Sequence, residues 1–302
     1  MEPREHRPHR GLLVLTLSTG VCAISSAAIF IRMAEAPGIT TAVFRTTISA
    51  LLMAIIAQVQ LGSGWWKLSR KELKVCSIAG VFLGLHFWAW MTSLEHTSVA
   101  SSVLFVAMNP IFVGILSPFV TGDKLDRRLW LGIALAVVGS LIVGYDDLQN
   151  SSSASVLGNA LALLGALCGS GYLLAGRIAR RTVRLQTYAA ATNASASALL
   201  IPIAIAVQAP FLDLPTQTYL LFVVIAVIPQ LIGHNSLVWS LKHLSPTMVS
   251  LVILAEPIGS GVLAYAVLDE TPTQTKILGA LVLMGGIFVA SLRGDDKTIK
   301  EG

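Results

Sequence analysis

Residues 94–144 read LEHTSVASSVLFVAMNPIFVGILSPFVTGDKLDRRLWLGIALAVVGSLIVG, and residues 241–291 read LKHLSPTMVSLVILAEPIGSGVLAYAVLDETPTQTKILGALVLMGGIFVAS. Aligned at a shift of 147 residues, the two stretches need no gap and share twelve of 51 positions, where composition alone would give roughly four. Pro110 falls on Pro257 in this alignment. Glycines keep the same register in the pairs Gly114 and Gly261, Gly132 and Gly279, and Gly139 and Gly286. The chain therefore contains an internal repeat. The shift that relates its two copies, 147 residues, is about half of the length of the chain.

The composition is that of a membrane protein. The 302 residues are 54% hydrophobic and 12% charged, with a mean hydropathy of +0.74. Soluble domains are usually about 25% charged, so this chain cannot cover a water-facing surface. The composition excludes an ordinary soluble enzyme, a disordered protein and a secreted disulfide scaffold. The length suffices for about ten helices of about 20 residues each.

Ten apolar runs are long enough to cross a bilayer as helices. They are 11–31, 40–61, 73–94, 98–120, 129–145, 156–176, 187–208, 218–241, 246–268 and 275–292. Because each repeat holds five helices, an odd number, the second repeat must cross the membrane in the opposite sense to the first. We therefore predict an all-α integral membrane protein with ten transmembrane helices arranged as two inverted five-helix repeats.

Basic residues predict the orientation of these helices and the boundaries of the segments. With the N-terminus in the cytoplasm, 18 of the 21 Lys and Arg residues lie on the cytoplasmic side, whereas Arg32 and Lys276 lie outside and Arg45 lies within a helix. We expect a multi-pass protein of the plasma membrane, such as the bacterial inner membrane. Its segments would be a cytoplasmic N-tail (1–10), the first repeat (11–145), an extracytoplasmic linker (146–155), the second repeat (156–292) and a cytoplasmic C-tail (293–302).

The sequence carries no motif for ATP-driven transport or for catalysis. It contains no phosphate-binding G-x-x-x-x-G-K-[ST] and no H-E-x-x-H, and its three cysteines lie in apolar runs rather than at metal-ligand spacings. The basic residues are spread among loops and form no nucleic-acid patch. We expect no enzyme activity, no cofactor, no metal and no nucleic-acid partner, and the chain could work as a monomer or a homodimer.

Pro110 and Pro257 each lie near the middle of an apolar run. A proline within a helix removes one backbone hydrogen bond. Interruptions at matching positions in two inverted repeats point to the substrate site of a transporter, although a tolerated kink is the simpler alternative.

With these features the sequence resembles the drug/metabolite transporter superfamily, and within it the ten-helix EamA-type family. The resemblance rests on the stretches Asn109-Pro110 and Glu256-Pro257-Ile258, on the acid that follows each proline (Asp123, Glu270), and on the glycines of the fifth and tenth runs. It covers about residues 11–292. It implies a central cavity lined by helices 1, 3, 4, 6, 8 and 9. It also implies export of amino acids or other small metabolites, often by proton exchange.

Glu256 lies near the centre of the ninth run, where an acid costs about 2.5–3.5 kcal/mol to insert. It is a candidate coupling acid or a partner for a substrate ammonium group, and the alternative is a protonated group that packs between helices. Its counterpart in the repeat, Asn109, cannot titrate but could bind substrate or a neighbouring helix. Arg45, in the second run, either extends its side chain to the headgroups or pairs with a substrate carboxylate or with an acid such as Glu256.

Polar and aromatic side chains gather in the third, sixth and eighth runs. The candidates are His86, Trp88 and Trp90 in the third run, Tyr172 in the sixth, and Gln230, His234, Asn235 and Trp239 in the eighth. Residues four apart share a helix face, which pairs His86 with Trp90 and Gln230 with His234. Because the third and eighth runs are equivalent in the repeat, we expect them to line one cavity for a small organic ligand. Packing within the bundle and anchoring at the membrane interface are the alternatives for these residues.

Taken together, these features favour a secondary active transporter that exports small metabolites by alternating access, with proton coupling as one option. The alternatives are an importer or exchanger of sugar-linked or phosphorylated solutes, and a membrane scaffold that transports nothing. Phosphorylated solutes would require several basic cavity residues, and Arg45 alone lies deep in the membrane.

Overall fold

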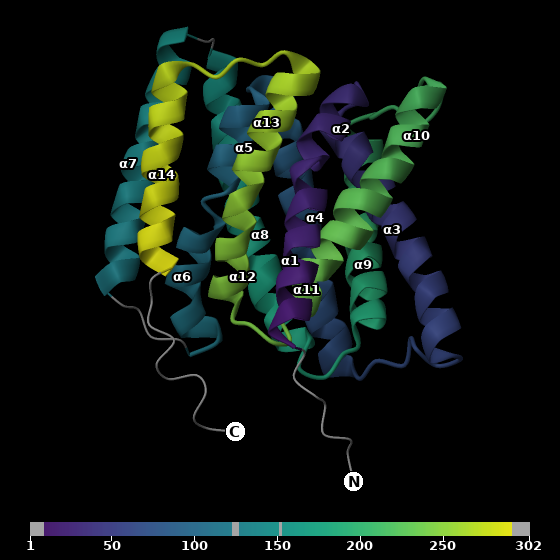
Figure 1. Ribbon diagram of the computed structural model, residues 1–302. Coiled ribbons are helices and arrows are strands. Elements are labelled where there is room, and N and C mark those ends of the chain that lie inside the picture. Colours follow the sequence, from purple (N-terminus) through teal and green to yellow (C-terminus); the bar gives the residue numbers. More distant parts are fainter. Residues whose placement is uncertain (1–8, 123–126, 151–152, 292–302) are drawn as a thin grey trace.

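The computed structural model describes residues 9–122, 127–150 and 153–291, and within them the chain is helical and contains no strand (Figure 1). In chain order the elements of the first half are α1 (Arg10–Ser25), α2 (Ala27–Met33), α3 (Gly38–Leu61), α4 (Arg70–His96), α5 (Val99–Val106), α6 (Asn109–Val120) and α7 (Arg127–Asn150). Those of the second half are α8 (Ser153–Ala179), α9 (Leu185–Ala206), α10 (Thr216–Ile225), η1 (Ala226–His234), α11 (Asn235–Ser240), α12 (Pro246–Val252), η2 (Ile253–Ala255), α13 (Glu256–Leu268) and α14 (Gln274–Ser291).

Consecutive elements combine into ten rods, and within the part of the chain that the structure describes, eight rods are long and apolar enough to cross a membrane. The eight are α1–α2, α3, α4, α5–α6, α8, α9, α10–η1–α11 and α12–η2–α13. The other two, α7 and α14, occupy the positions of the fifth and tenth helices and run side by side at one edge of the bundle (Figure 1). That α7 and α14 also cross the membrane stays a prediction.

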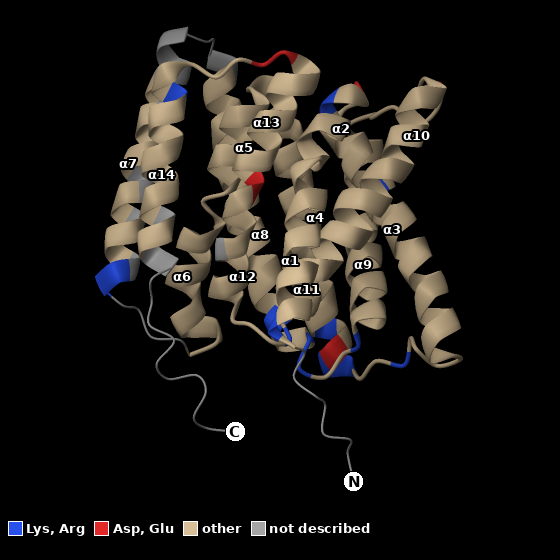
Figure 2. Cartoon of the chain, viewed as in Figure 1, with Lys and Arg blue, Asp and Glu red and all other residues tan. Residues whose placement is uncertain are grey.

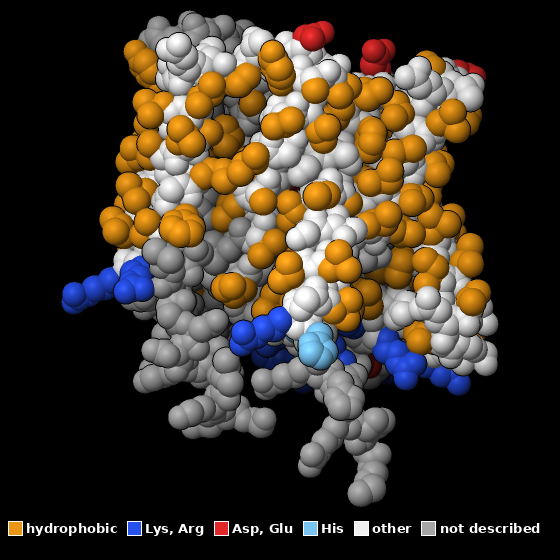
Figure 3. Space-filling view, in the orientation of Figure 1, with side chains coloured by type: hydrophobic (Ala, Val, Ile, Leu, Met, Phe, Trp, Pro, Cys, Tyr) orange, Lys and Arg blue, Asp and Glu red, His pale blue; other side chains and the backbone are white. Residues whose placement is uncertain are grey.

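The surface between the two ends of the bundle is apolar, as a lipid environment requires. Figure 3 shows hydrophobic side chains over one face of the bundle. Exposed apolar side chains of the chain include Val59, at 78%, and Leu15, at 64%. Most of the described Lys and Arg residues gather at the end where α1 begins, and the acidic segment between α13 and α14 lies at the opposite end (Figure 2). That the end where α1 begins faces the cytoplasm stays a prediction. The two chain tails and Asp123 lie outside the described residues.

Equivalent helices of the two repeats pack against each other. The structure places α3 against α9 and α7 against α14, and it places α5 against α13. The α7–α14 contact explains one glycine of the alignment: a Cβ atom on Gly139 would lie 2.4 Å from the backbone N of Leu283 and 2.7 Å from the carbonyl O of Gly279. The helices can approach this closely only because Gly139 has no side chain.

Both rods that contain a predicted proline break are interrupted, but the interruption precedes the proline. The helix α5 ends at Val106 and α6 begins at Asn109, so Pro110 is the second residue of the new helix. The helix α12 likewise gives way to the turn η2, and Pro257 is the second residue of α13. A proline ring collides with the carbonyl four residues earlier and is well tolerated in the first turn, which accounts for this placement.

Two further interruptions have no counterpart in the sequence predictions. The first rod breaks at Ser26, between α1 and α2. In the eighth rod, η1 is a nine-residue π-helix with Pro229 inside it. Such π segments are rare and often lie at functional sites.

Candidate substrate site

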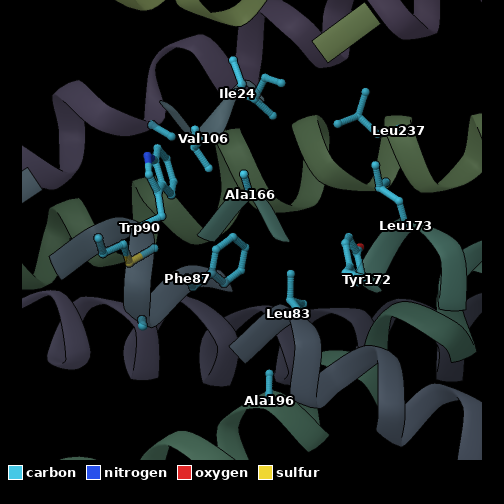
Figure 4. Packing of buried hydrophobic residues seen from close by; sticks show 14 of the residues in the cluster. Ile24, Leu83, Phe87, Trp90, Val106, Ala166, Tyr172, Leu173, Ala196 and Leu237 are labelled. Carbon is cyan, nitrogen blue, oxygen red and sulfur yellow. The ribbon is translucent and has the colours of Figure 1, made fainter. Parts of the chain in front are cut away.

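A cavity of about 50 Å³ lies where the interrupted rods meet, which is room for a few water molecules. Residues of six rods line it: α1–α2, α4, α5–α6, α8, η1–α11 and η2–α13. These are helices 1, 3, 4, 6, 8 and 9, the set that the sequence resemblance implied. Figure 4 shows apolar members of the wall, with Ile24, Val106 and Trp90 on one side and Tyr172 and Leu173 on the other.

Asn109 and Glu256 line the cavity from equivalent places, each at the first residue of the helix that follows an interruption. The Nδ2 atom of Asn109 donates to the carbonyl of Ala166 at 3.3 Å, whereas its buried Oδ1 has no partner. Glu256 is 8% exposed, and its backbone carbonyl accepts a 3.5 Å hydrogen bond from Ser25 Oγ. The two helix starts therefore present an unpaired amide oxygen and a carboxylic acid to one small space.

His86 and His234 face each other across the cavity wall, with ring centroids 6.3 Å apart. The Nδ1 atom of His86 lies 2.8 Å from the carbonyl of Gly165, so in that hydrogen bond Nδ1 carries the proton and leaves Nε2 as an acceptor. Trp90 stacks on His86 with centroids 6.0 Å apart, and Tyr172 lies 6.2 Å from His234. The third, sixth and eighth helices thus supply an aromatic wall of the kind that suits a small organic ligand.

Trp90 adds an unpaired donor to this wall. Its side chain is 3% exposed, and its Nε1 has no hydrogen-bond partner. Buried polar atoms in proteins are almost always paired, so a donor and an acceptor without partners beside one cavity are a feature that a bound polar solute would explain.

Arg45 does not extend to the headgroups, so that reading is wrong. Its side chain is 0% exposed, and it is the eighth residue of α3, a helix that packs against α4, α9 and η1. The Nε atom donates to Gln230 Oε1 at 2.9 Å, and Gln230 Nε2 donates to Asn193 Oδ1 at 3.2 Å. The guanidinium carbon lies 3.9 Å from the centroid of the Phe87 ring. Arg45 is therefore held inside the bundle, although it is not part of the cavity wall itself.

Three candidates lie away from the cavity. Trp88 is half-buried and is not part of the wall. Asn235 Nδ2 contacts Met53 Sδ at 3.3 Å, and the ring of Trp239 lies 4.7 Å from that of His243. Asn235 thus links α11 to α3, Trp88 packs against the core of the bundle, and Trp239 contacts a residue of its own segment.

The expected pair of Gln230 and His234 is divided between two environments. Both residues belong to the π-helix η1, in which hydrogen bonds close over five residues and four-residue spacing no longer defines a face. Gln230 therefore holds Arg45, whereas His234 faces the cavity.

Gly169 is a wall residue that is not among the candidates from the sequence. A Cβ atom there would lie 2.9 Å from Asn109 Nδ2 and 3.0 Å from His86 Nδ1. The missing side chain leaves room for two polar groups of the site. The available signal was its four-residue spacing from Gly165, which places both glycines on one face of α8.

The chain belongs to the EamA-like transporter family, which matches residues 9–145 and, a second time, residues 156–292. It is 22% identical over 274 residues to the pseudopaline exporter CntI of Pseudomonas aeruginosa. This alignment covers 91% of this chain and 93% of the exporter. It is also 22% identical to the uncharacterized transporter YyaM of Bacillus subtilis, over 83% of this chain and 84% of that protein.

Two other similarities are of a different kind. A stretch of 61 residues, 20% of this chain, is 31% identical to a probable 4-amino-4-deoxy-L-arabinose-phosphoundecaprenol flippase subunit, ArnE, of Pseudomonas fluorescens, and covers 54% of it. A protein crystal structure superposes on 94% of this chain and 98% of its own chain, with a TM-score of 0.70 and 20% sequence identity, and so supports the fold.

The family and its members identify a multi-pass membrane transporter rather than an enzyme. Its substrate is a small molecule, and its surroundings are the lipid bilayer.

Proposed function

We propose that this protein is a secondary active exporter of small metabolites, amino acids or related organic solutes, and that it works by alternating access in a plasma membrane. The observation that carries the proposal is the position of the cavity. It lies between two helix interruptions at equivalent places in the repeats, with Asn109 at one and Glu256 at the other. Inverted-repeat transporters bind their substrates at such a place.

The packing of the bundle supports alternating access. Equivalent helices contact each other where the two repeats meet, as α3 does with α9, so the repeats can rock about that contact in either direction. A cavity of about 50 Å³ is too small for a metabolite, so substrate binding requires the repeats to part. This structure would then correspond to a closed state between the two open ones.

Export, with both chain termini in the cytoplasm, is the direction we favour. The pseudopaline exporter is similar to this chain over nearly its whole length, and the basic residues gather at one end of the bundle (Figure 2). Glu256 is our candidate for proton coupling, because it is an acid that reaches the cavity from the membrane interior.

Counterflow in proteoliposomes tests the proposal. Vesicles loaded with single solutes from a panel of amino acids and other metabolites are assayed for exchange, with and without a pH gradient. We expect exchange for at least one amino acid or related solute, and we expect Asn109→Ala to reduce it. Gly285→Ala serves as the control because a Cβ atom there would meet nothing within 4 Å and Gly285 is not part of the cavity wall. Exchange of no panel solute would refute the proposal and favour a scaffold.

A second candidate is a carrier of sugar-linked or phosphorylated solutes, including ones with a lipid tail. It is favoured by the similarity to the flippase subunit ArnE and by an apolar groove of about 730 Å³ between α13 and α14, at the side of the bundle. Glu270 and Lys276 lie at its polar end. Exchange of a sugar phosphate, but of no amino acid, in the same panel would support this candidate over the first.

A further inference from the structure

The carboxylate of Glu270 joins three rods at the end of the bundle opposite the start of α1. Its Oε1 lies 3.5 Å from Nη2 of Arg32, in the last turn of α2. Its Oε2 accepts a 2.9 Å hydrogen bond from the backbone N of Val99, the first residue of α5, where the helix dipole favours a negative charge. One side chain at the end of α13 thus connects that rod to α1–α2 and to α5–α6.

The backbone on both sides of this contact is held in place. Asp269, which ends α13, has a φ of 54°, and the amide of Glu270 donates back to the carbonyl of Ala264 at 3.2 Å. A left-handed residue followed by a bond to the last turn is a common helix ending, so α13 itself sets the position of the carboxylate. Arg32 Nη2 also donates to the carbonyl of Thr97, between α4 and α5, at 2.7 Å.

The joined helices lie between the cavity and Glu270. Each has one end at the cavity wall: Ala27 is the first residue of α2, Val106 is the last of α5, and Glu256 is the first of α13. Their opposite ends carry the three groups that the carboxylate joins. The helix α13 also packs against both α2 and α5. These three helices therefore cover the cavity on this side, and the Glu270 contacts hold their far ends together.

We propose that Glu270 is a positioning residue for transport: its carboxylate keeps α2, α5 and α13 together, and the cavity opens toward this end only when these contacts separate. The inference rests on the proposed alternating access and assigns one of its two gates to a residue. The predicted topology places this gate outside. The side chains of Arg32 and Glu270 are 35% and 24% exposed, so water can solvate both charges when the pair separates. A fully buried pair would be far more costly to break.

The accessibility of a thiol in the cavity tests the inference without knowledge of the substrate. The native cysteines are replaced by alanine, and Val106→Cys, a change of small volume, places a thiol in the cavity wall. A membrane-impermeant maleimide is added to right-side-out and to inverted vesicles. Because the closed cavity has room for only a few water molecules, the maleimide reacts only when the cavity opens toward its side. The two rates therefore report the two open states separately.

Glu270→Gln should raise the reaction rate from the gate side and not from the other side. The amide keeps an acceptor for Val99 but loses the ion pair with Arg32, which corresponds to about a two- to fivefold increase for a partly exposed pair. Glu270→Ala also loses the hydrogen bond, and it should raise that rate about tenfold or more. Arg32→Gln should resemble Glu270→Gln. The double variant should exceed neither, because both residues act through one contact.

Asp213→Asn is the matched control. Asp213 is an exposed acid between α9 and α10 at the same end of the bundle, since Thr218 in α10 donates to the carbonyl of Ala34, just after α2. Its φ is 62°, a left-handed conformation that asparagine adopts readily. Asp213→Asn should keep the rates of the parent protein from both sides.

The outcomes separate a gate from a structural role. If Glu270→Gln raised the rates from both sides equally, the residue would only stabilise the fold, and the inference would be overturned. Unchanged rates from the gate side in Glu270→Gln and Glu270→Ala would overturn it as well, with alternating access left intact wherever the parent thiol reacts from both sides. A thiol that reacts from neither side in any variant would refute alternating access, and the inference with it.

Discussion

Substitution of Gly139 by Ala tests whether α7 and α14 pack as the fifth and tenth helices of the repeat. The new Cβ atom would lie 2.4 Å from the backbone N of Leu283, whereas ordinary contacts begin at 3.4 Å. The two helices must therefore separate by 1.0 Å, the difference between these distances, because a backbone atom cannot rotate away. Overpacking of this kind costs about 1–3 kcal/mol.

The sign of the effect distinguishes packing from helix propensity. Alanine is favoured over glycine by about 1 kcal/mol inside a helix, so Gly139→Ala would be stabilising if α7 stood alone. Gly285 lies in α14 itself, and a Cβ atom there would meet nothing within 4 Å. Gly285→Ala should therefore be neutral or slightly stabilising, and the two variants should differ by about 1–3 kcal/mol.

Thermal denaturation of the detergent-solubilised protein measures this difference. At roughly 2–4 °C for each kcal/mol in a large domain, Gly139→Ala should unfold several degrees below Gly285→Ala. Equal midpoints for the two variants, or a higher midpoint for Gly139→Ala, would refute the close α7–α14 contact and with it the ten-helix arrangement.

Three other predictions concern topology, the helix breaks and coupling. Reporter fusions at Asn150 and Arg180 should report opposite sides of the membrane, because the predicted topology puts 18 of 21 basic residues in the cytoplasm; equal signals would contradict the ten-helix count. Pro110→Ala and Pro257→Ala should insert normally but transport more slowly, since an alanine lets the helix continue through the interruption; wild-type rates would reduce both prolines to packing residues. Glu256→Gln should abolish accumulation driven by a pH gradient, because an amide cannot carry a proton, and gradient-driven uptake that persists in this variant would exclude Glu256 as the coupling acid.

The sequence predicts the helices well because each membrane span is a long, nearly uninterrupted apolar signal. The ninth run, 246–268, coincides with the rod that begins at Pro246 and ends at Leu268. The positions of the helix breaks could also be predicted from the sequence, because Pro110 and Pro257 align in the repeat. The π-helix could not be predicted in this way. Pro229 has no proline at the equivalent place in the first repeat, and the hydrophobic pattern does not indicate whether hydrogen bonds close over four or five residues.

Side-chain environments were harder to predict, and Arg45 shows the reason. Depth along a span can be read from the sequence, but rotation about the helix axis depends on which helices pack around it. Arg45 lies near one end of α3, where an arginine usually reaches the headgroups, yet it is buried against Gln230 of η1 and Phe87 of α4. For the same reason the sequence analysis included Trp88 and Trp239 among the site candidates, although neither is part of the cavity wall.

The symmetry of the fold and the chemistry of the site follow different rules. The shift of 147 residues that aligns the two helix breaks also relates other residues of the cavity wall, pairing Trp90 with Leu237 and Val106 with Ile253. Pseudo-symmetry thus builds the cavity, because both repeats send equivalent positions to it. The polar groups break this symmetry: Glu256 stands opposite Asn109, and the same shift places Thr192 opposite Arg45.

Glu256 is an acid whose counterpart in the other repeat, Asn109, cannot be charged, so the two sides of the cavity differ chemically. If the repeats rock as we propose, a solute in the cavity would meet Glu256 of one repeat and Asn109 of the other whichever repeat had moved. The motion would change the side from which the cavity is reached, but it would not exchange the carboxyl group for the amide. The symmetric backbone would then supply two similar open states, and the unmatched polar groups would hold a polar solute in one orientation through both.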